Sequence, residues 1–326
     1  MSGSEQLISS QTSSIGAVWP PVETTHNRVR GFYTDSIVTN TNVGAFAAQF
    51  TEQRERLETL GSDRLTIRVV AHAGALATLD AMGVAVEAAI PLANTPADNL
   101  VIAYTGHNKP NRSLDATTYV SLHHELLSRA VRRQSIAEPA EMLGVHGFTQ
   151  HIVDPTKAET LGPRFQELYA AFGYDEEDVV ELLGNSNNTI AYVEDNDLVI
   201  STAMAESGTV EIAGLGATNI VEITEASTHP DYRGHGLYKA ISGLLVQGLL
   251  EQRGHEISAL YGESNLAMPG VVYAAGENGR RFSHFDRATY GIIDPAFGIL
   301  PQNFHVGDGA EQRPYNDFAV SYVPLG

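Results

Sequence analysis

The sequence predicts an α/β protein in which a mixed central sheet flanked by helices fills the carboxyl-terminal half and a smaller α/β domain precedes it. Three observations support this prediction. Strand-like and helix-like segments alternate along the chain, a run of antiparallel strands interrupts them, and a glycine-rich turn joins one strand to a long amphipathic helix. A chain of 326 residues that is 43% hydrophobic can bury a sizeable core, and its length favours two domains over one.

The first half of the chain predicts the order β-α-β-α-β-β. Residues 1–25 carry turn formers and little periodicity, so we expect a flexible tail or an entry segment there, followed by an α/β domain over 26–144. The expected strands are 36–38, 65–70, 85–90 and 100–104, and the expected helices are 43–60, 75–82 and a bridging helix at 116–133.

The second half, residues 145–326, predicts a strand, two helices, an antiparallel run, a helix, a strand and a helix. The expected strands are 147–153, 189–193, 198–205, 209–212, 220–227 and 256–261, and the expected helices are 155–171, 176–183, 236–252 and 269–275. The remaining tail is rich in proline and glycine around short strands, and the sequence shows no internal repeat.

The composition excludes several classes of function. The chain has no cysteine, so a thiolate metal site, a disulfide and a cysteinyl acyl-enzyme are ruled out. A net charge of -19 argues against nucleic-acid or anionic-membrane partners, and no apolar run is long enough to span a bilayer. Acidic residues outnumber basic ones 39 to 20 and lysine is rare, a balance typical of halophilic proteins. The first residues lack the pattern of a signal peptide, so we expect a cytoplasmic protein.

A glycine-rich turn between a predicted strand and a predicted helix indicates a ligand site. It reads Arg233-Gly234-His235-Gly236 and follows His229-Pro230-Asp231-Tyr232. Glycines let a backbone approach a ligand closely, and the N–H groups and dipole at a helix start favour an anion such as a pyrophosphate. The arginine adds a charge-assisted contact.

Two other phosphate-binding motifs do not fit this turn. A dinucleotide fingerprint needs a third glycine after Gly236, and a Walker A loop needs Gly-Lys-Ser or Gly-Lys-Thr, and neither is present. A plain connecting turn does not explain so many special residues in one run. The pattern therefore favours a site for acyl-CoA.

With these residues in view, the chain resembles the GNAT superfamily of N-acetyltransferases. The hallmark of that superfamily, R/Q-x-x-G-x-G/A, is matched here by Arg233-Gly234-His235-Gly236-Leu237-Tyr238, with tyrosine in the last position where glycine or alanine is usual. The resemblance implies that these six residues bind acetyl-CoA as the cosubstrate without a metal. It also implies that a backbone N–H near Ser227 or Thr228 stabilises the acetyl oxygen and that Asn265 contacts the pantetheine arm.

A narrower likeness is to the beta-lysine N-acetyltransferase family, whose members also carry a degenerate α/β domain before the GNAT domain. It rests on the run 221–230, on Ile90-Pro91 and on the tail residues Leu300, Asn303, Val306, Asn316 and Tyr322. The chain departs from that family at Leu92-Ala93-Asn94 and in an insertion at 284–298. The likeness therefore implies the reaction class more than the particular amine.

Three residues are candidates for proton transfer during acetylation of an amine. Glu222 and Glu225 lie on the strand that leads to the glycine turn, where GNAT enzymes commonly hold a carboxylate base. A spacing of three places them on opposite faces of a regular strand unless a bulge intervenes. Tyr273 lies where many GNAT enzymes keep a tyrosine that protonates the departing thiolate. Each of the three also has a structural interpretation, as a surface carboxylate or a core tyrosine.

The sequence leaves the acceptor open. The first hypothesis is an N-acetyltransferase acting on a small-molecule amine, such as an amino acid related to lysine. A protein or peptide N-acetyltransferase, a longer-chain acyltransferase and a non-catalytic CoA-binding sensor are the alternatives, and a homodimer is left open. No metal is expected, because His123-His124-Glu125 has Ser128 where the H-E-x-x-H motif needs its second histidine.

Overall fold

The structure, a computed structural model, describes residues 28–59, 64–93, 100–108, 143, 147–170, 174–265, 274, 281–282, 299–302, 316–323 and 325. Within these residues the strands form two sheets, one of four strands and one of eight. The expected tail at 1–25 and the expected bridging helix at 116–133 lie outside the described residues. No helix in the described part of the chain has the length and apolarity needed to cross a membrane.

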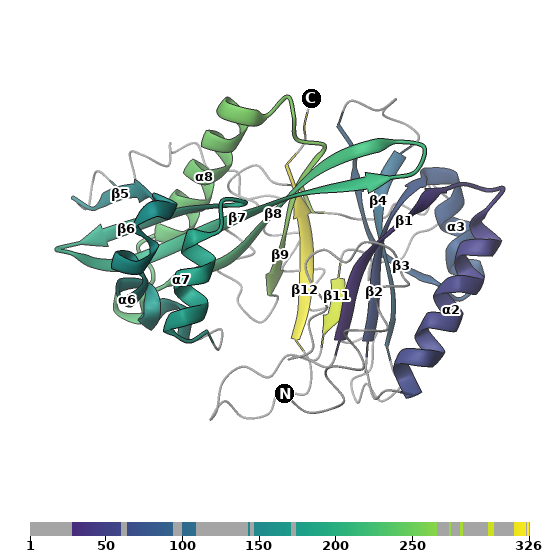
Figure 1. The fold of residues 1–326 in the computed structure, drawn as a ribbon, viewed down its shortest axis with the longest axis horizontal. Coiled ribbons are helices and arrows are strands. Elements are labelled where there is room, and N and C mark those ends of the chain that lie inside the picture. The colour runs from purple at the N-terminus through teal and green to yellow at the C-terminus, as the bar shows by residue number, and fades with distance from the viewer. Residues whose placement is uncertain are drawn as a thin grey trace.

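The first sheet has the strand order β1-β2-β4-β3, where β1 and β2 are parallel and the other neighbours are antiparallel. Its strands are β1 (Arg28–Val38), β2 (Arg64–His72), β3 (Ala85–Pro91) and β4 (Leu100–Asn108). Two helices, α2 (Val43–Thr59) and α3 (Ala73–Ala81), pack on one face of it through apolar side chains such as Phe46, Leu76 and Leu79. Figure 1 shows both helices on the side away from the second sheet.

The second sheet has the order β10-β12-β9-β8-β7-β6-β5, with β11 paired to β12, and only β8 and β9 are parallel. Its strands are β5 (Thr149–Ile152), β6 (Asn188–Asp195), β7 (Leu198–Ile212), β8 (Gly216–Thr228), β9 (Ala259–Asn265), β10 (Arg281–Phe282), β11 (Ile299–Gln302) and β12 (Asn316–Tyr322).

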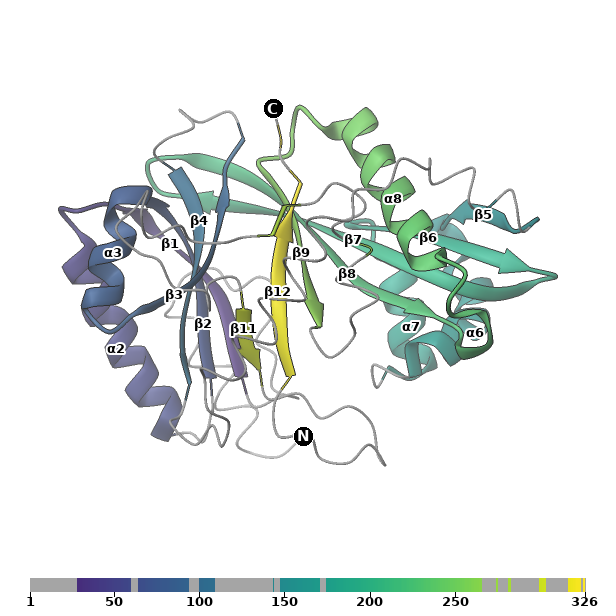
Figure 2. The ribbon, with the colours of Figure 1, turned by 180° about the vertical axis from the view of Figure 1, so that it is seen from behind.

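Helices cover both faces of the second sheet. A short 3-10 turn η2 (Pro155–Lys157) leads into α6 (Ala158–Tyr169), and α6 and α7 (Glu176–Gly184) pack on one face with Met204 of β7. A second 3-10 turn, η4 (Pro230–Tyr232), precedes α8 (Leu237–Arg253), which packs on the other face against Ala203 and Ala205. Figures 1 and 2 show α6 and α7 on the side opposite α8.

A layer of buried apolar side chains joins the two sheets. From the first sheet it takes Phe32, Val70, Ala88, Ile90 and Leu92, and from the second Val210, Ile212, Ile220, Ala259, Tyr261 and Val320. Backbone hydrogen bonds also cross between the sheets, from the Ala93 N–H to the Ser258 carbonyl (2.8 Å) and from the Ala213 N–H to the Thr34 carbonyl (2.9 Å). The face of the first sheet that α2 and α3 leave uncovered is thus buried against the second sheet.

The predicted fold class is confirmed, and three strand predictions need correction. The segments 198–205 and 209–212 belong to one strand, because Gly208 stays in the ladder opposite Ile220. The segment 36–38 is the end of a longer strand, β1. The strand expected at 256–261 begins at Ala259, because a turn that closes with a hydrogen bond from the Glu256 N–H to the Arg253 carbonyl comes first.

The two sheets share a pattern of connections that the sequence does not show. In the first, β1 is parallel to β2 with α2 between them, and β4 lies between β2 and the earlier strand β3. In the second, β8 is parallel to β9 with α8 between them, and β12 lies between β9 and the earlier strand β11. The first sheet therefore repeats the topology of the later part of the second.

Candidate functional site

The glycine turn lies at the end of β8 and opens α8. Gly234 has φ +87 and Gly236, the residue before the first helical position, has φ +72. Both are in the left-handed region that glycine adopts without steric cost, which explains why this turn uses glycine twice. Arg233, Gly234 and His235 are exposed, and the first turn of α8 has no acidic residue. Exposed N–H groups at a helix start with no nearby carboxylate on the helix favour an anionic ligand.

Three side-chain contacts hold the segment before the glycine turn. The Tyr232 hydroxyl donates to Asp195 (2.9 Å), and this contact raises the pKa of the tyrosine. His229 Nε2 lies 3.1 Å from Glu167 Oε1 of α6, while its Nδ1 accepts from the Asp231 N–H. The turn is therefore anchored to β6 and to α6, so its position relative to the sheet is fixed.

The parallel strands β8 and β9 part just before this turn. Their described pairing runs from Ile220 opposite Ala259 to Ile223 opposite Gly262. Beyond that point β8 continues to Thr228 in register with β7, and β9 continues to Asn265 in register with β12. Two parallel strands that separate in this way leave backbone groups of both edges available to an extended ligand.

A β-bulge in β8 begins at the same place. Thr202 is opposite Ser227 and Met204 is opposite Thr224, so two residues of β8, Glu225 and Ala226, face one residue of β7. Glu225 takes φ +43, a conformation that a residue other than glycine rarely adopts. Such strain is commonly found at functional sites, where the surrounding structure holds it.

The bulge places Glu222 and Glu225 on the same face of the sheet. Glu222 is opposite Glu206, on the face of β7 that also carries Met204. Glu225 accepts a hydrogen bond of 3.0 Å from the hydroxyl of Tyr174, which packs in the cluster of α6 and α7 on that face. Residues three apart on a regular strand lie on opposite faces, but the bulge brings these two to the same face. Both carboxylates therefore face the side of the second sheet on which α6, α7 and the first sheet pack.

Glu222 is buried, with 4% of its surface exposed, in a polar cluster between the sheets. Its Oε2 accepts from the Tyr261 hydroxyl (2.8 Å) and from Nη2 of Arg68 (3.1 Å), and the same nitrogen donates to Glu263 Oε1 (3.2 Å). Arg68 is on β2 of the first sheet and is 1% exposed. A carboxylate with two such donors is held in one orientation.

Glu225, in contrast, is half-buried and lies near tyrosines of α6 and the segment after it. Tyr169 is buried, and burial raises its pKa above the usual value. The hydrogen bond between Tyr169 and the Thr202 hydroxyl lowers this pKa, and the negative charge of Glu225 raises it. The phenol therefore stays protonated at neutral pH. The described surroundings of Glu225 thus include the hydroxyl group of Tyr174, whereas those of Glu222 include a guanidinium.

The other sequence-predicted site residues that the structure describes lie around the parting strands. Ser227 and Thr228 end β8, where the Ser201 hydroxyl donates to the Ser227 carbonyl (3.1 Å) and lies 3.0 Å from the Thr228 hydroxyl. Leu237 is buried, Tyr238 is half-buried, and Asn265 is the last residue of β9. Tyr273 lies outside the described residues. Within the described ranges, no group of histidines and acidic residues is placed to hold a metal.

Sequence reasoning missed Arg68 and Tyr174, which contact the two candidate carboxylates from distant parts of the chain. Arg68 is separated from Glu222 by 154 positions and Tyr174 from Glu225 by 51. The one available signal for Arg68 was a charged residue in the middle of the apolar strand Leu65–Val70, since a buried charge requires a partner.

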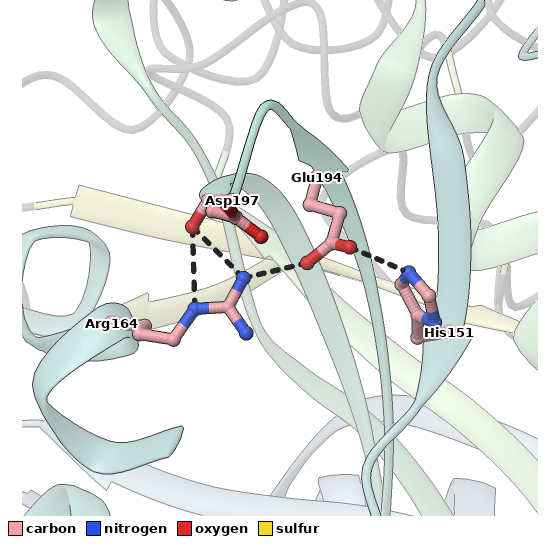
Figure 3. A network of polar contacts seen from close by, with 4 residues as sticks. All are labelled: His151, Arg164, Glu194 and Asp197. Carbon is pink, nitrogen blue, oxygen red and sulfur yellow. Dashed lines mark hydrogen bonds and ion pairs between the residues drawn. The ribbon is translucent and has the colours of Figure 1, made fainter. Parts of the chain in front are cut away.

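A second polar network lies at the far edge of the second sheet and is separate from this site. Figure 3 shows Arg164 of α6 donating to Glu194 (2.6 Å) and to the Asp197 carbonyl, while His151 contacts the other oxygen of Glu194 (3.0 Å). The hydrogen bond from Arg164 lowers the pKa of Glu194. This network ties α6 to the β6–β7 turn.

Comparisons with known proteins give structural similarities only. No family model matches the sequence, and no curated protein does. Among solved structures, NAA60 from Arabidopsis thaliana in complex with a bisubstrate analogue is 12% identical, with 55% of this chain and 99% of that chain covered and a TM-score of 0.40. Glucosamine-6-phosphate N-acetyltransferase from Arabidopsis thaliana is 13% identical, over 37% and 84% of the chains, with a TM-score of 0.30. An aminoglycoside acetyltransferase from an uncultured soil metagenomic sample, in complex with sisomicin, is 11% identical, over 37% and 80%, with a TM-score of 0.30.

Proposed function

We propose that this chain is an acetyl-CoA-dependent N-acetyltransferase of the GNAT superfamily that acts on the amine of a small molecule. One observation carries the proposal. A strand parts from its parallel neighbour at Ile223 and Gly262, carries a bulge at Glu225, and ends in a glycine turn that opens a helix. These features supply, in chain order, an edge for an extended ligand, a strained carboxylate and an anion site.

The donor side of the site follows from this arrangement. The pyrophosphate of acetyl-CoA is held by the turn and helix start formed by Arg233, Gly234, His235, Gly236, Leu237 and Tyr238. The pantetheine arm lies between the parted strands, with Asn265 as its polar contact on β9. A backbone N–H near Ser227 or Thr228, just after the bulge, stabilises the acetyl oxygen as it becomes negative.

The acceptor side requires a group that takes a proton. The amine nitrogen attacks the thioester carbonyl carbon, the C–S bond breaks, and the amine loses a proton to a carboxylate, Glu222 or Glu225, directly or through a water. The departing thiolate takes a proton from Tyr273. Glu222 and Glu225 face the same side of the sheet, so both remain candidates for the base.

The acceptor that we propose is a small amine, such as an amino acid related to lysine. Support for an amine comes from Glu225, a half-buried carboxylate beside the parted strands, because a cationic ammonium approaches a carboxylate favourably. The resemblance to the beta-lysine N-acetyltransferase family favours the lysine-like choice. Peptide amines and longer acyl chains are the competing possibilities on the same fold.

The test is a measurement of CoA release from acetyl-CoA with free amino acids, polyamines and short peptides in parallel. We expect turnover with a small amine, and a loss of about 100-fold in kcat for the variant that lacks the base, Glu222→Gln or Glu225→Gln. Binding of acetyl-CoA without turnover of any amine would instead favour a CoA-binding sensor. Preference for peptides would move the proposal to a protein N-acetyltransferase.

A further inference from the structure

Two cross-strand pairs, one from each sheet, face each other in the layer between the sheets. Phe32 is opposite Arg68 on β1 and β2, and Glu222 is opposite Tyr261 on β8 and β9. The guanidinium carbon of Arg68 lies 5.6 Å from the centre of the Phe32 ring and 5.3 Å from that of Tyr261. The Phe32 and Tyr261 rings and the carboxylates of Glu222 and Glu263 together hold the guanidinium in one place.

Arg68 reaches β8 and β9 at the point where they part. The last described pair between these strands is Ile223 opposite Gly262. Glu222 comes one residue before that pair on β8, and Glu263 comes one residue after it on β9. One nitrogen of Arg68, Nη2, donates to both carboxylates. The side chain therefore links the two strands immediately before the separation that we assign to the pantetheine arm.

Without this cation, the carboxylates would repel each other. The titratable and charged side chains near Glu222 include Arg68 from β2, Tyr261 and Glu263 from β9, and Glu206, its cross-strand partner on β7. Like charges on neighbouring strands are unfavourable, and carboxylates that share a site bind a proton more readily. A guanidinium at hydrogen-bond distance has the opposite effect and keeps them ionised.

We propose that Arg68 is a positioning residue of the acetyl transfer, acting through Glu222, which it orients and keeps unprotonated. The first sheet is then a working part of the active site, because it supplies the guanidinium that contacts Glu222. This inference rests on the proposed function and on Glu222 taking part in it. It adds a residue from a part of the chain that no motif connects with the reaction.

The experiment follows the titration of the Glu222 carboxyl and the pH profile of kcat/KM in the full-length protein. The titration is measured by NMR on protein labelled with 13C at glutamate carboxyls, where the signal of Glu222 is the one that Glu222→Gln removes. In Arg68→Gln we expect the midpoint to move up by about one to three pH units. We expect kcat/KM at neutral pH to fall by about tenfold or more, with the dissociation constant of acetyl-CoA unchanged.

Two further variants separate positioning from simple support of the fold. Arg68→Lys keeps the positive charge but loses the planar guanidinium with its several N–H donors. Its Glu222 titration midpoint should therefore lie close to that of the wild type, and its kcat/KM should lie between those of the wild type and Arg68→Gln. Glu263→Gln removes a competing carboxylate and should move the midpoint down, opposite to Arg68→Gln. It also keeps the inference testable if Arg68→Gln does not fold. The matched control is Arg164→Gln, which removes an arginine–glutamate pair of 2.6 Å at the far edge of the sheet and should move neither readout.

The outcomes are distinguishable. An unchanged midpoint and an unchanged acid limb in both Arg68→Gln and Glu263→Gln overturn the inference, even if the wild-type protein acetylates an amine. A wild-type protein that binds acetyl-CoA but turns over no amine refutes the proposed function and the part of Arg68 in it. The NMR titration, which needs no turnover, then still decides whether Arg68 controls the charge of Glu222.

Discussion

Replacing Gly234 by alanine tests the donor site most directly. An added Cβ would meet no atom within 4 Å, so the substitution brings no clash and its effect comes from the backbone alone. At φ +87 an L-residue costs about 1–2 kcal/mol relative to glycine. In the free variant the exposed turn can relax to a conformation without this strain. Acetyl-CoA must then bring the turn back to the left-handed conformation when it binds. The dissociation constant of acetyl-CoA should therefore rise by about 5- to 30-fold, since 1.4 kcal/mol is a factor of ten.

The assay is isothermal titration with acetyl-CoA, accompanied by urea unfolding of each variant. Gly83→Ala is the matched control, because Gly83 follows α3 with φ +82 and an added Cβ there also meets nothing within 4 Å. It should cost at most about 1–2 kcal/mol of stability and leave the affinity for acetyl-CoA unchanged. Wild-type affinity in Gly234→Ala, or equal weakening in Gly83→Ala, would refute the assignment of the glycine turn to the donor.

Three other substitutions have defined outcomes. Tyr174→Phe removes the hydroxyl that donates to Glu225, so kcat should fall by about five- to tenfold at constant acetyl-CoA affinity, and an unchanged kcat would contradict a role for that contact. Gly162→Ala places a Cβ 2.5 Å from a side chain of α7, so urea unfolding should show a loss of about 1–3 kcal/mol. Arg164→Gln removes the partner that lowers the pKa of Glu194, so it should cost about 1 kcal/mol at neutral pH. A carboxyl whose pKa is lower in the folded protein than the unfolded value of 4.5 stabilises the fold above that value. The difference in unfolding free energy between wild type and Arg164→Gln should therefore disappear as the pH falls through the folded pKa. A difference that does not depend on pH would contradict this.

The features that sequence predicts well in this chain are local. The glycine turn was predictable because Gly234 and Gly236 follow a strand and precede a helix, and the backbone there does take left-handed angles. The helix after it was predictable from its apolar spacing, and α8 begins within one residue of the expected position. These features depend on neighbours in the chain, which is what a sequence displays directly.

The rest depends on contacts between distant segments. A spacing of three does not reveal that a bulge brings Glu222 and Glu225 to one face, because the bulge is defined by the register with β7. Similarly, Arg68 becomes part of the site only when the first sheet packs on the second. The common topology of the two sheets is hidden for the same reason, since strand order follows from pairing and not from residue identity.

The apolar layer between the two sheets has a consequence for how the chain can be divided. A fragment that begins near residue 145 would keep every residue of the glycine turn but would expose Val210, Ile212, Tyr261 and their neighbours to water. It would also leave Glu222 without its guanidinium. An apolar surface of that kind favours self-association over a stable monomer. The domain boundary expected near residue 144 is therefore a poor place to truncate the protein, and a stable protein made from this chain requires both halves together.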